Sequence, residues 1–176
     1  IGTTPGTWAA GGALPTARGY SGGAGIQNAN LIFGGIPAPL KNATEHYNGS
    51  TWSKGGTMLT ERFYIGGAGT EYAALGFAGT APSGDSFTEE YYGQTWAAGG
   101  AMITARGEGI VSAGTQNAAL AAGGGPGPGG VTCTEEYNGT SWAVGGALNA
   151  GRRSLSGAGT QDAALAAGGI SVATHP

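Results

Sequence analysis

The sequence predicts an all-β fold built from four repeats of about 44 residues. The first observation is that tryptophan recurs at nearly constant spacing. The second is composition: the chain has 39 Gly and 8 Pro among 176 residues, and each interior Gly costs a helix about 1 kcal/mol. The third is that 40% of residues are hydrophobic and the net charge is only −3, which opposes disorder. The glycines therefore serve turns and close strand packing.

Matched landmarks return in every repeat. The four tryptophans are 44, 44 and 46 residues apart, and each precedes a pair of glycines. An arginine follows, then a Gly/Ala-rich segment, an Ala-x-Leu segment and a second pair of small residues. Three repeats continue into Thr-Glu-x-Tyr. The landmarks are Trp8, Trp52, Trp96 and Trp142; Arg18, Arg62, Arg106 and Arg152; and Tyr47, Tyr91 and Tyr137.

Each repeat is predicted to form four antiparallel strands, so the whole chain, 1–176, makes one domain. In the first repeat we expect strands near 20–26, at 29–33, at 43–47 and around Trp52. Alternation places Ala29, Leu31 and Phe33 on one face of the second strand. An Asn-Gly pair at 48–49 is a strong hairpin signal between the last two strands.

This pattern resembles the kelch repeat, with Arg18, Gly34-Gly35, Tyr47 and Trp52 at the motif's conspicuous places. The resemblance covers nearly the whole chain and implies a small β-propeller of four kelch-like blades. These blades are richer in Gly and Ala, and fewer, than is usual for kelch propellers. Runs such as Thr-Glu-Glu-Tyr-Asn-Gly-Thr-Ser-Trp also resemble Gly/Ala-rich kelch-like arrays in structural and tail proteins of marine bacteriophages.

The two ends of the chain complement each other. The last repeat stops before its Thr-Glu-x-Tyr, and the N-terminus begins where that part would continue, with Ile1 aligned to Glu45 and Trp8 to Trp52. Because closure removes exposed strand edges, we expect a ring of four blades whose last blade is shared by the N- and C-terminal segments. Two alternatives remain: a four-repeat piece of a longer propeller, and half of an eight-bladed dimer.

The repeated polar residues favour structure over catalysis. A ring of arginines could hold an anion, but a residue at one place in every blade is more simply explained by bonding to loop carbonyls. Paired carboxylates can act in glycosidases, yet the acidic residues recur with the repeat: Glu45, Glu89, Glu90, Glu135 and Glu136. His46, His175 and Cys133 are too few for the copper chemistry of some kelch propellers. We expect no catalytic residue, no metal and no cofactor.

The segments between the second and third strands differ most among the repeats, at 36–43, 80–87, 125–133 and 170–176. Such loops carry function because the scaffold tolerates their change. We therefore predict a binding surface on the face where they emerge. Its candidate ligand-binding residues are Pro37, Lys41, His46, Pro82, Asp85, Pro126 and Pro128.

These observations predict a non-enzymatic binding or structural module, in a virion appendage or in receptor recognition. A glycan-binding lectin propeller is the alternative. The expected partner is a protein or a cell-surface glycan, and assembly of the chain into a homo-oligomer is left open. The expected location is the virion or the extracellular space. Mild acidity opposes nucleic-acid binding, and no apolar run approaches the roughly 20 residues that cross a membrane.

Overall fold

The protein is all-β, which confirms the predicted class. The computed structural model describes residues 6–80, 86–125 and 130–171, and these form three four-stranded antiparallel sheets and one two-stranded sheet. Sheet 1 consists of β1 (Gly22–Ile26), β2 (Ala29–Phe33), β3 (Thr44–Tyr47) and β4 (Trp52–Lys54). Sheet 2 consists of β5 (Gly66–Gly69), β6 (Ala74–Phe77), β7 (Thr88–Tyr91) and β8 (Trp96–Ala98).

The remaining strands continue the same order. Sheet 3 consists of β9 (Val111–Thr115), β10 (Ala118–Ala122), β11 (Thr134–Tyr137) and β12 (Trp142–Val144). Sheet 4 consists of β13 (Arg153–Gly159) and β14 (Ala164–Ile170). A short 3₁₀ turn, η1 (Leu40–Asn42), lies between β2 and β3. Each four-stranded sheet pairs its strands in sequence order, so local hairpins build the whole sheet.

The turns within a sheet follow from local chemistry. Asn48 Oδ1 accepts hydrogen bonds from the backbone N–H groups of Ser50 and Thr51, at 3.0 and 2.9 Å. Gly49 has a φ of +93°, which only glycine adopts without strain. The Asn-Gly turn predicted between β3 and β4 is confirmed, and the predicted strand at 29–33 coincides with β2.

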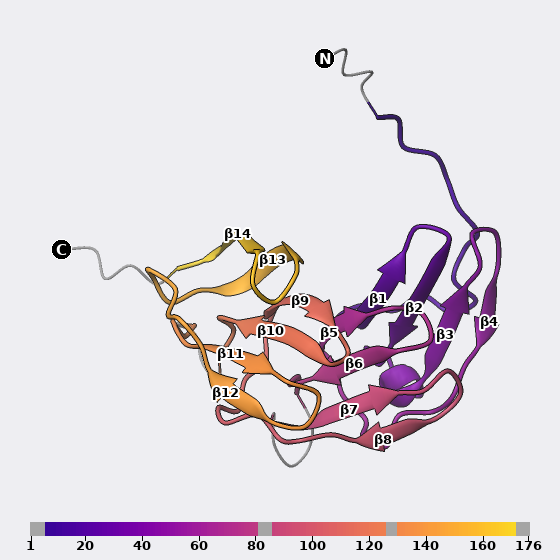
Figure 1. Ribbon diagram of the computed structural model, residues 1–176. Helices are drawn as coiled ribbons and strands as arrows, with labels where there is room; N and C mark the ends of the chain where they lie inside the picture. The colour runs from indigo at the N-terminus through magenta and orange to yellow at the C-terminus, as the bar shows by residue number, and fades with distance from the viewer. Residues whose placement is uncertain (1–5, 81–85, 126–129, 172–176) are drawn as a thin grey trace.

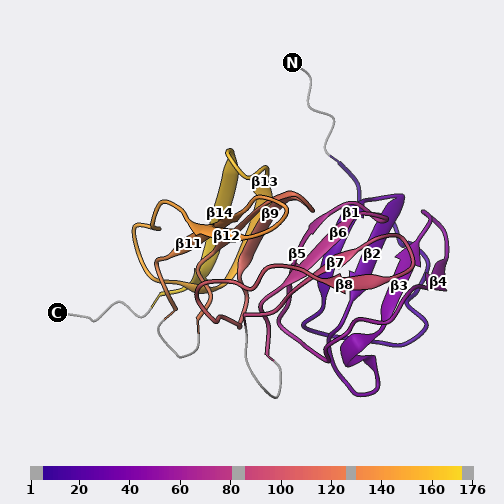
Figure 2. The same cartoon turned by 60° about the horizontal axis from the view of Figure 1, so that its bottom comes forward.

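The four sheets stand side by side in an open arc, with sheet 1 at one end and sheet 4 at the other (Figures 1 and 2). The first strands of the sheets form the inner row: β1 packs on β5, β5 on β9, and β9 on β13. Small residues permit this approach, because a Cβ added at Gly67 would lie 2.3 Å from the carbonyl oxygen of Gly23 in the neighbouring sheet. Alanine and glycine on the inner strands therefore set the spacing between sheets.

Large aromatic side chains fill the junctions, by which we mean the packed contacts between neighbouring sheets. Trp96 packs edge-on against Phe33 of the preceding sheet, with ring centroids 5.0 Å apart. Its indole Nε1 donates to Thr44 Oγ1 at 2.9 Å. The next junction repeats both contacts at the same distances, through Trp142, Phe77 and Thr88. Sheets 2 and 3 are thereby each held against the sheet before them.

The glycine pairs after Trp52 and Trp96 belong to the same junctions. The N–H of Gly56 donates to the hydroxyl of Tyr91 in the next sheet, at 3.4 Å. A Cβ at Gly56 would lie 1.9 Å from the carbonyl oxygen of Gln94, in the β7–β8 turn. At Gly100 the corresponding distance, to the carbonyl oxygen of Thr140, is 2.1 Å. Glycine is required there because the next sheet's turn crosses the backbone.

Sheet 3 differs from the first two by a compensating exchange. Gly66 and Phe77 are cross-strand partners, and a Cβ at Gly66 would lie 2.5 Å from the Phe77 ring. The equivalent partners in sheet 3 are Val111 and Ala122, which are 1% and 2% exposed. A large residue on one strand thus requires a small one opposite, and either arrangement fills the space.

This exchange predicts strong coupling in sheet 2. Gly66→Val alone should lower the free energy of unfolding by about 1–3 kcal/mol through overpacking, and Phe77→Ala alone by about 3–5 kcal/mol through a cavity. Together they should cost about 1–3 kcal/mol less than their sum, because the valine enters the space that the ring leaves. Denaturant unfolding of the two single variants and the double variant measures this. Simple additivity would contradict the proposed complementarity.

Sheet 4 is incomplete within the described residues, where β13 and β14 pair only with each other. The N-terminal segment predicted to complete it makes no strand pair with β14 in the described residues. Gly12, at the end of that segment, bonds sheet 1: its N–H donates to the Tyr47 hydroxyl at 3.2 Å, as Gly56 N–H does to Tyr91 of the next sheet, and its carbonyl accepts from Trp52 Nε1 at 2.9 Å. Trp8 is fully exposed. A blade shared by the two ends is therefore not seen in the described part of the chain.

Candidate functional site

In the three four-stranded sheets the side chain of the repeated arginine is buried, whereas Arg152, before sheet 4, is half-buried. Arg62 has no exposed surface, and its Nη1 donates to the carbonyls of Ala78 and Phe87 at 2.8 and 2.9 Å. Its Nη2 forms an ion pair with Glu89 of β7 at 2.8 Å. Burial lowers the pKa of Arg62, and the Glu89 carboxylate opposes that shift.

The same ion pair recurs in the sheets on either side. Glu89 also accepts the N–H groups of Leu59 and Thr60, at 2.7 and 3.2 Å, so one carboxylate ties the approach to β5 onto β7. The other pairs are Arg18 with Glu45, at 2.9 Å, and Arg106 with Glu135. These guanidiniums and carboxylates face each other inside the sheets, and do not converge on a shared ligand site.

The junction between sheets 1 and 2 differs from the others because it holds a cluster of titratable side chains. Between sheets 1 and 2, His46 of β3 places Nδ1 3.0 Å from Glu71 Oε1, and both side chains are less than 10% exposed. Because a carboxylate only accepts hydrogen bonds, Nδ1 is the donor. His46 Nε2 lies 2.8 Å from the hydroxyl of Tyr91, which donates to the Gly93 carbonyl at 2.8 Å.

Two tyrosines of this cluster have raised pKa values for different reasons. Tyr72 stacks on the His46 ring at 5.3 Å, and its hydrogen bond with Glu71 raises the pKa of Tyr72. The pKa of Tyr91 is raised chiefly by burial, which disfavours the tyrosinate. Tyr91 has no exposed surface, whereas Tyr72 is 61% exposed. Tyr72 is therefore the most exposed member of the cluster.

The other junctions use a glutamine at the place of Glu71. Gln116 Nε2 donates across its junction to the carbonyls of Ala74 and Tyr91, at 3.2 and 2.7 Å. Gln161 does the same toward sheet 3, at 3.0 and 2.8 Å. At the position of His46, sheet 2 has Glu90, which accepts from the Tyr137 hydroxyl at 2.6 Å. Burial and this carboxylate raise the pKa of Tyr137 to about 12.

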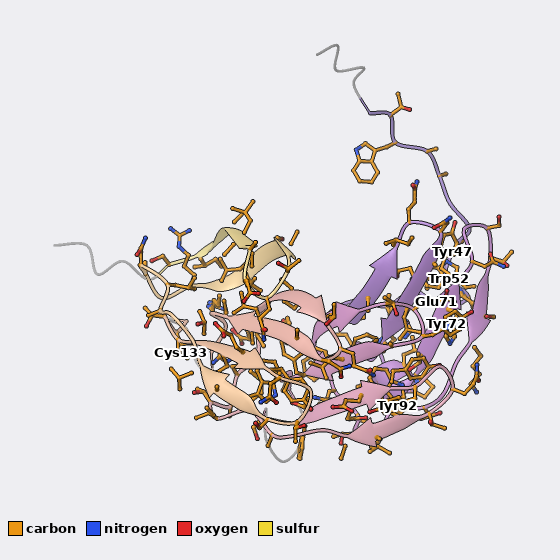
Figure 3. The ribbon with its side chains drawn as sticks, in the orientation of Figure 1. Tyr47, Trp52, Glu71, Tyr72, Tyr92 and Cys133 are labelled. Carbon is orange, nitrogen blue, oxygen red and sulfur yellow. The ribbon has the colours of Figure 1, made fainter. Side chains whose placement is uncertain are left out.

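A hollow of about 220 Å³ adjoins the junction between sheets 1 and 2. Its walls are the β1–β2 and β5–β6 turns, with Ile26 on one side and Glu71 and Tyr72 on the other. Ile26 is 67% exposed and Tyr72 is 61% exposed, and these two large side chains flank the opening. Figure 3 shows Glu71 and Tyr72 on the same side of the molecule as Tyr47 and Trp52. An apolar hollow with few polar groups is the usual form of a small-ligand site.

The residues predicted for the binding face are dispersed. Pro37 is exposed and Lys41 is half-buried, both between β2 and β3 at the opposite end of sheet 1 from the hollow. His46 does not lie on that face: it is 6% exposed inside a junction, because β3 turns its side chain toward Glu71. Pro82, Asp85, Pro126 and Pro128 lie outside the described residues.

Sequence reasoning missed Glu71 and Tyr72, although the signal was present. Three repeats have Gln-Asn or Gln-Asp in the turn between the first two strands, and only the second has Glu-Tyr. The same repeat-by-repeat comparison identifies His46 as the histidine in a place otherwise held by glutamate. The two departures face each other across one junction, which the chain's linear order does not reveal.

Searches beyond this chain add no assignment: no family model matches it, and no curated protein matches its sequence. The described residues include no cluster of three or more His, Cys, Asp or Glu placed to hold a metal ion. Nor does the described part of the chain contain a helix long and apolar enough to cross a membrane. The hollow with Ile26, Glu71 and Tyr72 is the candidate site, because it combines apolar walls with an exposed aromatic ring.

Proposed function

We propose that this chain is a non-enzymatic binding module and that the hollow between sheets 1 and 2 is its ligand site. The observation that carries the proposal is the exposed Tyr72 beside the carboxylate of Glu71. His46 fixes that carboxylate from behind, and the stacked His46 ring supports Tyr72. A rigid aromatic surface with a held acceptor binds ligands without large ordering costs.

The ligand class that this arrangement favours is a neutral glycan. Sugar rings present C–H faces that pack on tyrosine, and their hydroxyls donate to a carboxylate, which has several acceptor positions. The alternative ligand is a protein, in the structural or receptor-recognition role of a virion appendage. The resemblance to bacteriophage kelch-like arrays supports that role, and with it a virion or extracellular location.

The sheets are proposed to be blades of a β-propeller. Repeated four-stranded antiparallel sheets, a first strand on the inner side of each sheet, and the same tryptophan contacts at two successive junctions all support this. A binding site at a junction between blades then follows naturally, because ligand pockets form where structural units meet. The buried ion pairs and the buried tyrosine hydroxyls bond within the sheets and between them. Because these groups serve the scaffold, they support a binding role over a catalytic one.

Binding to a glycan array tests the proposed ligand class. We expect Tyr72→Ala to weaken binding of any retained glycan by at least about tenfold, because the stacking surface is lost. The matched control is Tyr92→Ala: Tyr92 is 58% exposed but lies in sheet 2 beside Glu90, away from the hollow. The control should bind as the unaltered protein does. Absence of binding to every sugar would overturn the glycan assignment and leave a protein partner.

A further inference from the structure

The third junction is missing a tryptophan. Thr134 occupies the place of Thr44 and Thr88, but its hydroxyl donates to the Gly146 carbonyl at 2.6 Å instead of accepting from an indole. A hollow of about 270 Å³ lies beside it, between sheets 3 and 4, lined in part by Ala122, Thr134 and Leu148. In the two complete junctions, the tryptophan of the following sheet fills this place.

Gly146 marks the same vacancy. At Gly12, Gly56 and Gly100, an added Cβ would lie 1.9–2.1 Å from a carbonyl oxygen two residues before the next tryptophan. At Gly146 no atom of the described residues lies within 4 Å of such a Cβ. The backbone at Gly146 does not require glycine, since its φ is not in the left-handed region. The fourth Gly pair therefore faces an empty socket, which we define by Ala122, Thr134 and Gly146.

The chain contains one fully exposed tryptophan that fits this socket. Trp8 begins the run Trp-Ala-Ala-Gly-Gly, which is identical to residues 96–100, and Trp96 fills its own socket. The glycines of the run are already docked, since Gly12 N–H bonds Tyr47 as Gly56 N–H bonds Tyr91. In the complete sheets, the strand that begins with the tryptophan is the fourth strand, and the glycines after it dock on the next sheet. Trp8 therefore lies where the fourth strand of a sheet preceding sheet 1 would lie, and the described residues contain no such sheet.

We propose that a second copy of this chain docks head to tail, so that Trp8 of one copy enters the socket of the other. Sheet 1 and sheet 4 lie at opposite ends of the arc (Figure 1), and so cannot provide this junction to each other as they stand. When sheet 1 of the second copy packs against sheet 4 of the first, the two copies form a fourth junction after those between sheets 1 and 2, 2 and 3, and 3 and 4. The Gly6 carbonyl, two residues before Trp8, then faces Gly146. Two copies joined twice in this way close a ring of eight sheets.

The apolar surface on sheet 4 is consistent with this docking. Leu165 of β14 is 68% exposed, whereas its counterparts Leu31 and Leu75 have no exposed surface. Ile170, at the end of the same strand, is 52% exposed. A long, exposed, apolar edge strand favours pairing with another chain unless it is covered. The second copy is the partner whose surface already matches that of a neighbouring sheet.

Mass measurement in solution across a concentration series tests the proposal on the full chain. We expect a two-chain species whose dissociation constant rises at least about tenfold in Gly146→Ala, because the added methyl meets the partner's Gly6. The melting temperature of the dissociated chain should not change, because the Cβ at Gly146 lies in open space. Trp8→Ala should weaken association similarly. Ala97→Ser, on the exposed outer strand of sheet 2, is the control and should leave it unchanged.

A mixing experiment separates this arrangement from closure within one chain. Trp8→Ala retains the socket and Gly146→Ala retains the tryptophan, so the mixed pair has one intact junction and should associate more tightly than either variant alone. A monomer at every concentration would overturn the proposal, whether its Trp8 were buried or exposed. A dimer that neither substitution weakens would overturn it as well.

Discussion

Replacing Arg62 with methionine is expected to lower the free energy of unfolding by about 3–5 kcal/mol. The substitution leaves the Glu89 carboxylate, whose side chain is 3% exposed, without a cation. It also removes the donor that serves the carbonyls of Ala78 and Phe87. A buried charge without a partner costs far more than the net value of the intact pair. Denaturant unfolding measures the effect.

The matched control is the partly exposed ion pair between Arg153 and Glu108, whose side chains are 26% and 41% exposed. Glu108→Gln should cost no more than about 1 kcal/mol, because water screens and replaces that interaction. Adding Glu89→Gln to Arg62→Met should recover part of the loss, since the amide is neutral and its single oxygen keeps one of the two bonds that the carboxylate accepts from Leu59 and Thr60. Equal losses for Arg62→Met and Glu108→Gln would contradict the structural role assigned to the buried pair.

Trp96→Ala is expected to cost about 3–5 kcal/mol, the second large effect. Trp96 is 6% exposed, packs against Phe33 and hydrogen-bonds Thr44. Its loss leaves a cavity in the junction between sheets 1 and 2 and an unpaired buried hydroxyl. Unfolding should be followed at a concentration where the chain is monomeric, so that association does not contribute.

Trp8→Ala provides the contrast within the same sequence motif. Because Trp8 is fully exposed in the single chain, its removal should change the unfolding free energy by no more than about 0.5 kcal/mol under those conditions. At concentrations that favour the two-chain species, the same change should become destabilising. A large loss in the monomer would show that Trp8 is buried within its own chain, as a ring closed by the two ends requires.

The candidate site and the proposed assembly surface use different parts of the molecule. The hollow with Ile26, Glu71 and Tyr72 lies between sheets 1 and 2, and the socket with Thr134 and Gly146 lies between sheets 3 and 4. Their tests are therefore independent: Tyr72→Ala should leave association unchanged, and Gly146→Ala should leave the hollow intact. An effect of one substitution on the other property would indicate long-range change in the arc.

The repeat pattern anticipated the local structure because hairpins are built from near neighbours. Alternating apolar residues placed β2 at Ala29–Phe33, and the Asn48-Gly49 pair placed the turn before β4. It did not anticipate His46, which was assigned to the loop face. Its partner Glu71 is 25 positions away and lies in another sheet, so nothing near His46 in the sequence distinguishes a buried histidine from an exposed one.

By itself, the sequence determined the all-β class, the period and the places of the turns, since each depends on residues within one repeat. Only the tertiary structure decided which repeat holds a site, because the three four-stranded sheets carry the same scaffold and the difference appears where Glu71 and His46 meet. It also decided how the ends lie. The landmarks of the first and last repeats match those of a closed ring, but whether a tryptophan reaches its socket depends on the spacing of whole sheets. Gly67 and the other small residues between the inner strands set that spacing, and in the resulting arc Trp8 is exposed.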